Sequence, residues 1–96
     1  MVKVVWTELA IEDLKAIHTY VSQDSKFYAD RLIETLISRV DQLEAYPQSG
    51  RIVPEFRKEI LRELIEGNYR IIYSIGENQI AIVRVHHAAR LLRTLS

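Results

Sequence analysis

The chain has 96 residues, of which 48% are hydrophobic and 27% charged, and its formal net charge at pH 7 is zero. This balance is typical of a globular protein and excludes an intrinsically disordered chain, while the length suits one domain spanning residues 1–96. Because the sequence lacks cysteine, disulfides and thiolate-bound metals are excluded. No apolar stretch approaches the roughly 18 residues that a membrane span needs, so we expect a cytoplasmic protein without membrane contact.

The zero net charge hides an asymmetry along the chain. Residues 1–50 carry 5 Lys/Arg and 8 Asp/Glu, whereas residues 51–96 carry 8 Lys/Arg and 5 Asp/Glu. No acidic residue follows Glu77, so the charged residues between Asn78 and Ser96 are all basic. We expect a functional surface on this segment, facing either a nucleic acid or an acidic partner.

The first part of the chain predicts a short strand followed by an amphipathic helix. Residues 2–6 show the alternation of a strand. Thr7 follows and can cap a helix, because its hydroxyl can accept from the exposed backbone N–H groups of the first turn. Helical spacing then predicts that four apolar residues face the core: Ala10, Leu14, Ile17 and Val21.

A second amphipathic helix is predicted over residues 27–46. The polar run over residues 22–26 ends the first helix and can cap the second. Apolar residues again recur at helical spacing: Ala29, Leu32, Leu36, Val40 and Leu43. Pro47 and Gly50 end this helix, since proline cannot donate to the helix ladder and glycine tolerates a chain reversal. Two adjacent helices with a short link predict an antiparallel helical hairpin.

The remainder of the chain predicts three strands joined by tight turns. An apolar segment with mixed periodicity over residues 60–65 indicates the first strand. Residues 69–75 and 79–85 are rich in β-branched and aromatic side chains, and a glycine-containing turn precedes each. These strands should form an antiparallel meander that residues 2–6 can join. The helical hairpin would pack on one face of this small, mostly antiparallel sheet, which gives an α+β fold.

The sequence offers little for cofactor or metal chemistry. Its three glycines are too far apart for a phosphate-binding loop. His18 has no acidic or histidine partner at metal-binding spacing, and adjacent His86 and His87 on a strand would point to opposite faces. We therefore expect no cofactor and no metal. The acidic residues are expected on solvated helix faces without a distinctive carboxylate pair, and Tyr69 and Tyr73 are expected to pack or hydrogen-bond.

Candidate functional residues gather in and around the last strands: Arg62, Arg70, Arg84, His86, His87 and Arg90. If the last two strands pair across their turn, Arg70 and the residues near His86 fall roughly opposite each other, and a one-residue difference in register decides whether His86 or His87 faces the basic cluster. A guanidinium can fork onto two phosphate oxygens and an imidazole can move a proton near neutral pH, a combination suited to RNA cleavage. The alternative is that Arg70 forms an ion pair with Glu63 or Glu66 and that the histidines are solvent-exposed.

Several blocks of sequence resemble one protein family. The first half contains Trp6-Thr7, Ala10, Asp13-Leu14, Ile17 with Tyr20, and Pro47-Gln48-Ser49-Gly50-Arg51. The second half contains Leu61-Arg62-Glu63-Leu64, Gly67-Asn68-Tyr69-Arg70-Ile71-Ile72-Tyr73 and Val85-His86-His87-Ala88-Ala89-Arg90. In this order the blocks cover nearly the whole chain, and together they resemble the RelE/ParE toxin family.

The resemblance implies the toxin of a bacterial type II toxin–antitoxin pair, also called a plasmid stabilisation protein. Toxins of this family have a helical hairpin packed on a small antiparallel sheet. The resemblance further implies a cognate antitoxin whose C-terminal segment wraps the toxin and neutralises it. Because such antitoxins bind their own operator DNA, this chain would reach that DNA only through the antitoxin.

One branch of the family cuts mRNA on the ribosome. Arg70 falls at the position of a sheet arginine that these RelE-like enzymes use, and the resemblance then implies Arg70, His87 and Arg90 as catalytic residues. RelE-like members usually have a tyrosine or histidine near the C-terminus. No tyrosine follows Tyr73, so His86 or His87 would have to supply the general acid.

The other branch poisons DNA gyrase by binding, without hydrolysis. The segments at residues 61–64 and 87–90 resemble this ParE branch more closely, so we expect a gyrase-directed toxin that is not an enzyme. Its contact surface for target or antitoxin would include eight residues: Arg62, Tyr69, Arg70, Arg84, His86, His87, Arg90 and Arg93. A third alternative is an inactive member that only binds antitoxin.

Overall fold

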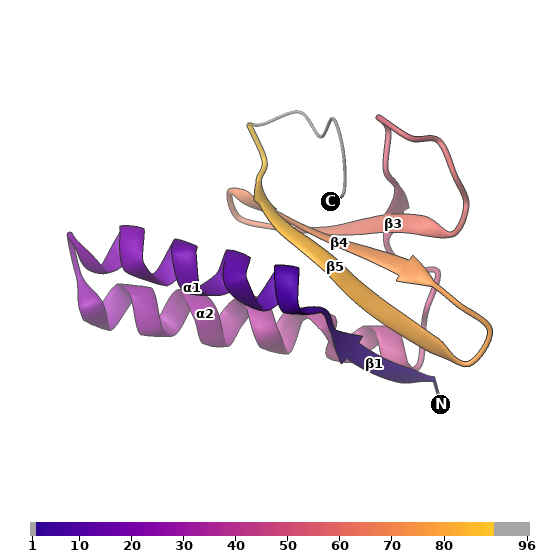
Figure 1. The fold of residues 1–96 in the computed structure, drawn as a ribbon, viewed down its shortest axis with the longest axis horizontal. Coiled ribbons are helices and arrows are strands. Elements are labelled where there is room, and N and C mark those ends of the chain that lie inside the picture. Colours follow the sequence, from indigo (N-terminus) through magenta and orange to yellow (C-terminus); the bar gives the residue numbers. More distant parts are fainter. Residues whose placement is uncertain (1, 90–96) are drawn as a thin grey trace.

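A computed structural model describes residues 2–89 and shows a helical hairpin beside a five-stranded sheet (Figure 1). The elements are β1 (Lys3–Trp6), α1 (Glu8–Ser22), α2 (Lys26–Arg39), the 3-10 helix η1 (Val40–Glu44), β2 (Arg51–Ile52), β3 (Leu61–Glu66), β4 (Tyr69–Ile75) and β5 (Gln79–His87). The strand order is β1-β5-β4-β3-β2, and only the β1–β5 pair is parallel. The predicted α+β fold with a mostly antiparallel sheet is therefore confirmed.

Both helices begin at the residues that the sequence indicates. The Thr7 hydroxyl oxygen accepts from the backbone N–H of Ala10, and the Ser25 hydroxyl oxygen accepts from that of Tyr28. Thr7 also joins the helix to the sheet, because its hydroxyl donates to the backbone oxygen of Ile82 over 2.8 Å. α1 therefore starts where β1 leaves the sheet.

The second helix is shorter than the predicted span of residues 27–46. The α-helix ends at Arg39, and the chain continues as the 3-10 helix over Val40–Glu44. In a 3-10 helix, side chains three residues apart project from the same side. Val40 and Leu43 therefore both point into the core, where they are 4% and 0% exposed. The apolar spacing that suggested a longer α-helix is therefore equally compatible with a 3-10 helix over these residues.

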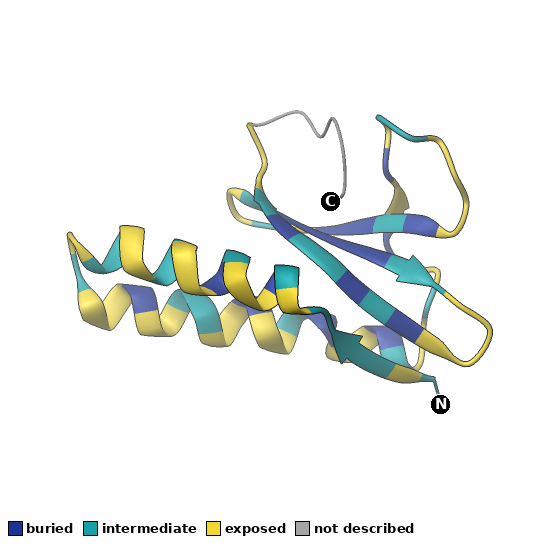
Figure 2. Ribbon diagram, in the orientation of Figure 1, coloured by how far each residue is buried: buried dark blue, intermediate teal, exposed yellow. Residues whose placement is uncertain are grey.

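The sheet buries apolar side chains on both of its faces, and buried residues run along its central strands (Figure 2). The face toward the helical hairpin holds the larger cluster, in which Leu64, Ile71 and Ile82 pack with α1 and α2. Leu61 belongs to a smaller cluster with Val53 and Ile72. Successive strand residues point to opposite faces, so burial on both faces explains the mixed periodicity of residues 60–65. The short strand β2 is an element that the sequence did not indicate.

The free edge of β5 is closed by a carboxylate. β1 pairs with β5 only as far as Ile82. Beyond that point, Asp13 of α1 accepts from the backbone N–H of Val85 over 2.9 Å and from Arg84 Nε over 2.7 Å. The hydrogen bond that Arg84 donates to Asp13 raises the pKa of the Arg84 guanidinium. Asp13 thus takes the place of a strand partner at this edge of β5.

Tyr73 fastens the loop before β2 to the sheet. Its side chain is fully buried, and its hydroxyl donates to the backbone oxygen of Pro47 over 2.8 Å and accepts from the N–H of Gly50 over 2.9 Å. A Cβ at residue 50 would lie 2.6 Å from this hydroxyl and from the backbone oxygen of Glu63. Glycine is therefore required at residue 50, and the expectation that Tyr73 packs and hydrogen-bonds is confirmed.

We predict that Tyr73→Phe lowers the free energy of unfolding by about 1–3 kcal/mol at pH 7, because it leaves two buried backbone groups without their partner. Burial also raises the pKa of Tyr73 above its ordinary value of 10.0. The folded state thus holds the phenol proton more tightly, so this contribution to stability is complete below pH 10 and is lost as the pH rises further. Urea unfolding at pH 7 and pH 11 measures both effects. Tyr46→Phe, at an exposed ring, is the control and should leave both values unchanged.

We predict that Asp13→Asn lowers the free energy of unfolding by about 2 kcal/mol. Arg84 loses its negatively charged partner, and the backbone N–H of Val85 is left with a neutral acceptor in place of a carboxylate. Amide hydrogen exchange should become faster at Val85 in the Asp13→Asn variant than in the wild type. The exchange at Ile82, which remains paired with β1, should change less. Glu12→Gln, at an exposed neighbouring residue, is the matched control. Equal loss of stability in both variants would contradict a role for Asp13 at the strand edge.

Candidate functional site

Arg70 lies in the middle of an ion-pair network on the sheet face opposite the helical hairpin. It pairs in register with His86 across the β4–β5 hairpin, and this register decides the choice between His86 and His87 that the sequence left open. Its residue exposure is only 5%. Its Nε donates to Glu63 over 2.6 Å, and its two terminal nitrogens donate to the two carboxylate oxygens of Glu55, each over 2.7 Å. Carboxylate oxygens thus accept from the guanidinium N–H groups that could otherwise bind a phosphate.

Two arginines and two glutamates make up this network. Glu63 is 1% exposed and lies on β3 between its neighbours on β2 and β4. Arg51 on β2 donates from Nε to Glu63 over 2.5 Å. Glu55 comes from the loop after β2 and reaches over the sheet. The two positive and two negative charges therefore balance, and the hydrogen bonds that Arg70 donates to Glu55 and Glu63 raise the pKa of its guanidinium.

The network decides between the two interpretations of Arg70. The alternative of an ion pair with Glu63 is confirmed, whereas Glu66 binds Arg39 on α2, with 3.3 Å between Nε and Oε1. Glu66 and Glu63 point to opposite faces of β3 because strand side chains alternate. The expectation that no carboxylate pair stands out is wrong, since Glu55 and Glu63 meet on one guanidinium.

The other described candidates are distributed over both faces of the sheet. Arg84 is held by Asp13, and Arg62 donates to the backbone oxygens of Glu59, Gln48 and Gly50. The ring of His87 meets that of Tyr69 edge-on at a centroid distance of 5.6 Å, on the hairpin side. His86 shares the face of Arg70, as cross-strand partners do. Arg90 and Arg93 lie outside the described residues.

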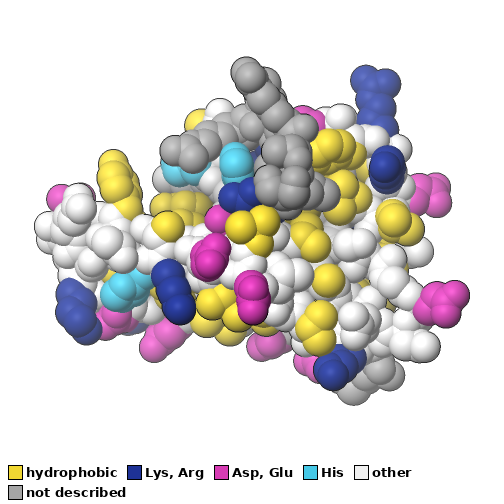
Figure 3. Space-filling view, in the orientation of Figure 1, with side chains coloured by type: hydrophobic (Ala, Val, Ile, Leu, Met, Phe, Trp, Pro, Cys, Tyr) yellow, Lys and Arg dark blue, Asp and Glu magenta, His cyan; other side chains and the backbone are white. Residues whose placement is uncertain are grey.

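Positive and negative side chains are intermixed on one face of the molecule. On the face in Figure 3, Lys and Arg side chains are interspersed with Asp and Glu. Arg84 and Arg70 are each ion-paired, Arg84 with Asp13 and Arg70 with Glu55 and Glu63. A shallow depression of about 350 Å³ lies over the network, lined by Arg51, Pro54, Glu55, Ile65, Arg70 and Ala88. Its mixed apolar and ion-paired lining suits contact with a polypeptide.

The sequence missed one contact between the helices. His18 Nε2 on α1 lies 2.6 Å from Asp30 Oδ1 on α2, and Lys26 Nζ lies 3.3 Å from the other oxygen. The hydrogen bond from His18, followed by that from Lys26, lowers the pKa of Asp30. His18 and Asp30 are each six positions from Asp24 in the turn between the helices. Residues at equal distances from the turn of an antiparallel hairpin lie side by side, and this spacing could have indicated the pair.

Residues 2–89 offer neither a cluster of metal ligands nor a candidate membrane span. No three His, Cys, Asp or Glu side chains in this range come together in a way that could hold a metal ion. None of the helices there is long and apolar enough to cross a membrane.

We predict that Arg70→Ala lowers the free energy of unfolding by about 3–5 kcal/mol, because Glu63 would keep a buried charge with only Arg51 beside it. Glu55→Gln should cost about 1 kcal/mol, since Glu55 is closer to solvent. Urea unfolding measures both changes. Lys58→Ala, at an exposed residue of the same loop, should be neutral. An Arg70→Ala variant as stable as the wild type would show that the network contributes nothing to folding.

Comparisons with known proteins place these features in a family. The model for the ParE toxin of type II toxin–antitoxin systems, parDE, matches residues 4–92. Toxin RelE2 of Caulobacter vibrioides is 37% identical over 91 residues, which cover 95% of this chain and all of the relative.

Two solved structures are similar in fold. The chromosomal ParDE toxin–antitoxin system from P. aeruginosa matches with a TM-score of 0.76 and 23% identity, over 91% of this chain and 96% of that one. The YoeB dimer from Staphylococcus aureus matches with a TM-score of 0.59 and 15% identity, over 90% and 95%. With the family match spanning nearly all of the sequence, this chain belongs to the ParE toxin family of type II toxin–antitoxin systems.

Proposed function

We propose that this toxin arrests growth by binding and poisoning DNA gyrase in the cytoplasm, and that a cognate antitoxin neutralises it. The observation that carries the proposal is the state of Arg70, whose guanidinium is held by Glu55 and Glu63. RNA cleavage needs a cation that can reach the phosphate as charge develops there. A toxin that acts by binding needs no such group, so a closed network is compatible with its action.

A second candidate function is ribosome-dependent mRNA cleavage. Two observations favour it: His86 lies directly across from Arg70, and the 37% identical relative carries the name Toxin RelE2. For this chemistry the Glu55 carboxylate must first leave the guanidinium. The cost of separating such a hydrogen-bonded pair makes binding the better-supported activity.

The antitoxin is proposed as the partner because of the family. The similar P. aeruginosa structure is described as a toxin–antitoxin system, and the family model names the same kind of system. We propose a hetero-oligomeric complex in which contact with operator DNA is made by the antitoxin. The near-neutral charge of this chain, with a sequence pI of about 6.8, supports an indirect contact with DNA.

Two assays with the purified toxin test the proposal. We predict that the wild type inhibits supercoiling by DNA gyrase and leaves mRNA intact on programmed ribosomes. Glu55→Gln is the diagnostic variant, because it removes the negative charge that holds the outer side of Arg70 while keeping the size of the side chain. It should leave both results unchanged for a gyrase-directed toxin, and it should raise mRNA cleavage for a ribonuclease.

Each alternative has its own outcome in these assays. Cleavage of mRNA by the wild type, without inhibition of supercoiling, would overturn the gyrase proposal in favour of the ribonuclease. Inactivity in both assays, together with normal growth when the toxin is expressed without antitoxin, would identify an inactive antitoxin-binding protein. Addition of purified cognate antitoxin should abolish whichever activity is present.

A further inference from the structure

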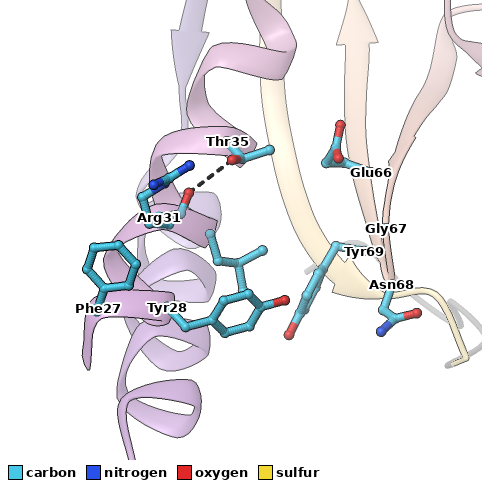
Figure 4. Close-up of a pocket in the computed structure, with 9 residues that line it drawn as sticks. Phe27, Tyr28, Arg31, Thr35, Glu66, Gly67, Asn68 and Tyr69 are labelled. Atoms are coloured by element: carbon cyan, nitrogen blue, oxygen red, sulfur yellow. Dashed lines mark hydrogen bonds between the residues drawn. The ribbon is translucent and has the colours of Figure 1, made fainter. Parts of the chain in front are cut away.

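The shallow depression over the ion-pair network contains a ligand from the chain itself. Glu55 places its two carboxylate oxygens against the two terminal nitrogens of Arg70, each over 2.7 Å. This is the two-point geometry in which a guanidinium binds a carboxylate. By contrast, the hydrogen bond drawn at the larger cleft between α2 and the β3–β4 turn, of about 470 Å³, joins Thr35 to the backbone oxygen of Arg31 within α2 (Figure 4). The depression therefore displays the chemistry that it recognises.

Glu55 is the exchangeable member of the network. The Glu63 side chain is 0% exposed on β3, whereas that of Glu55 is 16% exposed and belongs to the loop between β2 and β3. The same loop holds Arg57 at a φ of 53°, in the left-handed region that is unfavourable for residues other than glycine. A loop in such a conformation can move away when another carboxylate takes over the guanidinium of Arg70.

Arg51 gives the depression a second cation at the surface. Its Nε donates to Glu63 over 2.5 Å, but its side chain is 60% exposed and its terminal nitrogens make no hydrogen bond with any of residues 2–89. Arg51 and Arg70 both line the depression. Without Glu55, these two positive charges and the one negative charge of Glu63 leave a net charge of +1. One incoming carboxylate restores the balance and meets both guanidinium groups.

Exchange avoids the cost that opposes opening of the network by itself. If Glu55 leaves without a replacement, Arg70 keeps a buried charge with Glu63 as its remaining carboxylate. If a carboxylate from a partner arrives as Glu55 leaves, the number of charge-assisted hydrogen bonds stays the same. Glu55 then acts as a competitor with a high effective concentration, because it belongs to the same chain. Removal of Glu55 should therefore strengthen the binding of an external carboxylate.

The rest of the lining favours a polypeptide over a nucleic acid. Pro54, Ile65 and Ala88 contribute apolar surface to the depression. Ile65 is 41% exposed and lies in register with Arg70 across the β3–β4 pair. An apolar side chain next to an acidic one can cover this surface, whereas a sugar–phosphate backbone offers no apolar group. A single net positive charge also provides little of the phosphate neutralisation on which nucleic-acid binding depends.

We propose that this depression binds an acidic side chain of a partner polypeptide, which replaces Glu55 on Arg70 while an adjacent apolar side chain covers Ile65. The loop that carries Glu55 then moves away from the sheet. The proposal goes beyond the binding of gyrase, because carboxylate exchange at this surface can fail while supercoiling is still inhibited.

NMR spectra of the full-length toxin test the exchange, with the short peptide acetyl-Leu-Glu-Leu-amide as the probe. The side-chain Nε–Hε signals of Arg70 and Arg51 should shift and saturate with this peptide, and should not respond to acetyl-Leu-Gln-Leu-amide. Glu55→Ala should bind the glutamate peptide about tenfold more tightly, because the internal competitor is gone. Glu59→Ala removes an exposed carboxylate from the same loop and should bind like the wild type. The signals of Asn68, which lines the separate cleft, should stay unchanged.

Several results would overturn the proposal. Equal shifts with both peptides, or no shift in either the wild type or Glu55→Ala, would show that no carboxylate is exchanged at Arg70. Saturation of the Arg70 signal by inorganic phosphate or a tetraribonucleotide at lower concentration than the peptide would identify a phosphate site. Thermal melting checks that the variants fold, and Glu55→Gln takes the place of Glu55→Ala if the latter does not. Supercoiling assays on the same samples keep this outcome apart from that of the gyrase proposal.

Discussion

Glu63 is the charge around which the sheet face opposite the helical hairpin is organised. A carboxylate that is 1% exposed requires hydrogen-bonded cations. Arg51 and Arg70 supply them from the two neighbouring strands, and Glu55 then balances the second arginine. Because Glu55 belongs to the loop after β2, satisfying the buried charge also folds that loop over the sheet. One carboxylate thus couples three strands and a loop.

The same organisation shapes what the molecule can do. Arginines that would form a cationic surface are used internally, with Arg70 bound by glutamates, Arg84 by Asp13 and Arg62 by backbone oxygens. Chemistry on a phosphate would need one of these cations to be released first. Binding by exposed side chains needs no such release, and the exposed rings of Tyr20, Phe27 and Tyr28 lie at the end of α1 and the start of α2. The ion-paired arginines of the sheet and these exposed rings therefore belong to different elements.

Most elements of the fold could be predicted because their causes are local. Thr7 and Ser25 cap the helices through hydrogen bonds to residues three positions away. The pairing of Arg70 with His86 was not determined locally, because the β4–β5 register shifts by one residue between Ile72 and Tyr73 and the sequence does not indicate that irregularity. The end of α2 at Arg39 was missed, because apolar residues at Val40 and Leu43 fit both an α-helix and a 3-10 helix. β2 was missed because two residues are too few for a periodic signal.

The candidate site depended on contacts between residues that are far apart in the chain. The sequence by itself determined the α+β fold, the order of the helices and strands and the resemblance to a toxin family, all of which follow from spacing and from blocks of adjacent residues. Only the tertiary structure decided the state of the basic residues. Asp13 and Arg84 are 71 positions apart, and Glu55 and Arg70 are 15 apart. The availability of a charge depends on which opposite charge lies within a few ångströms, and periodicity does not record that distance.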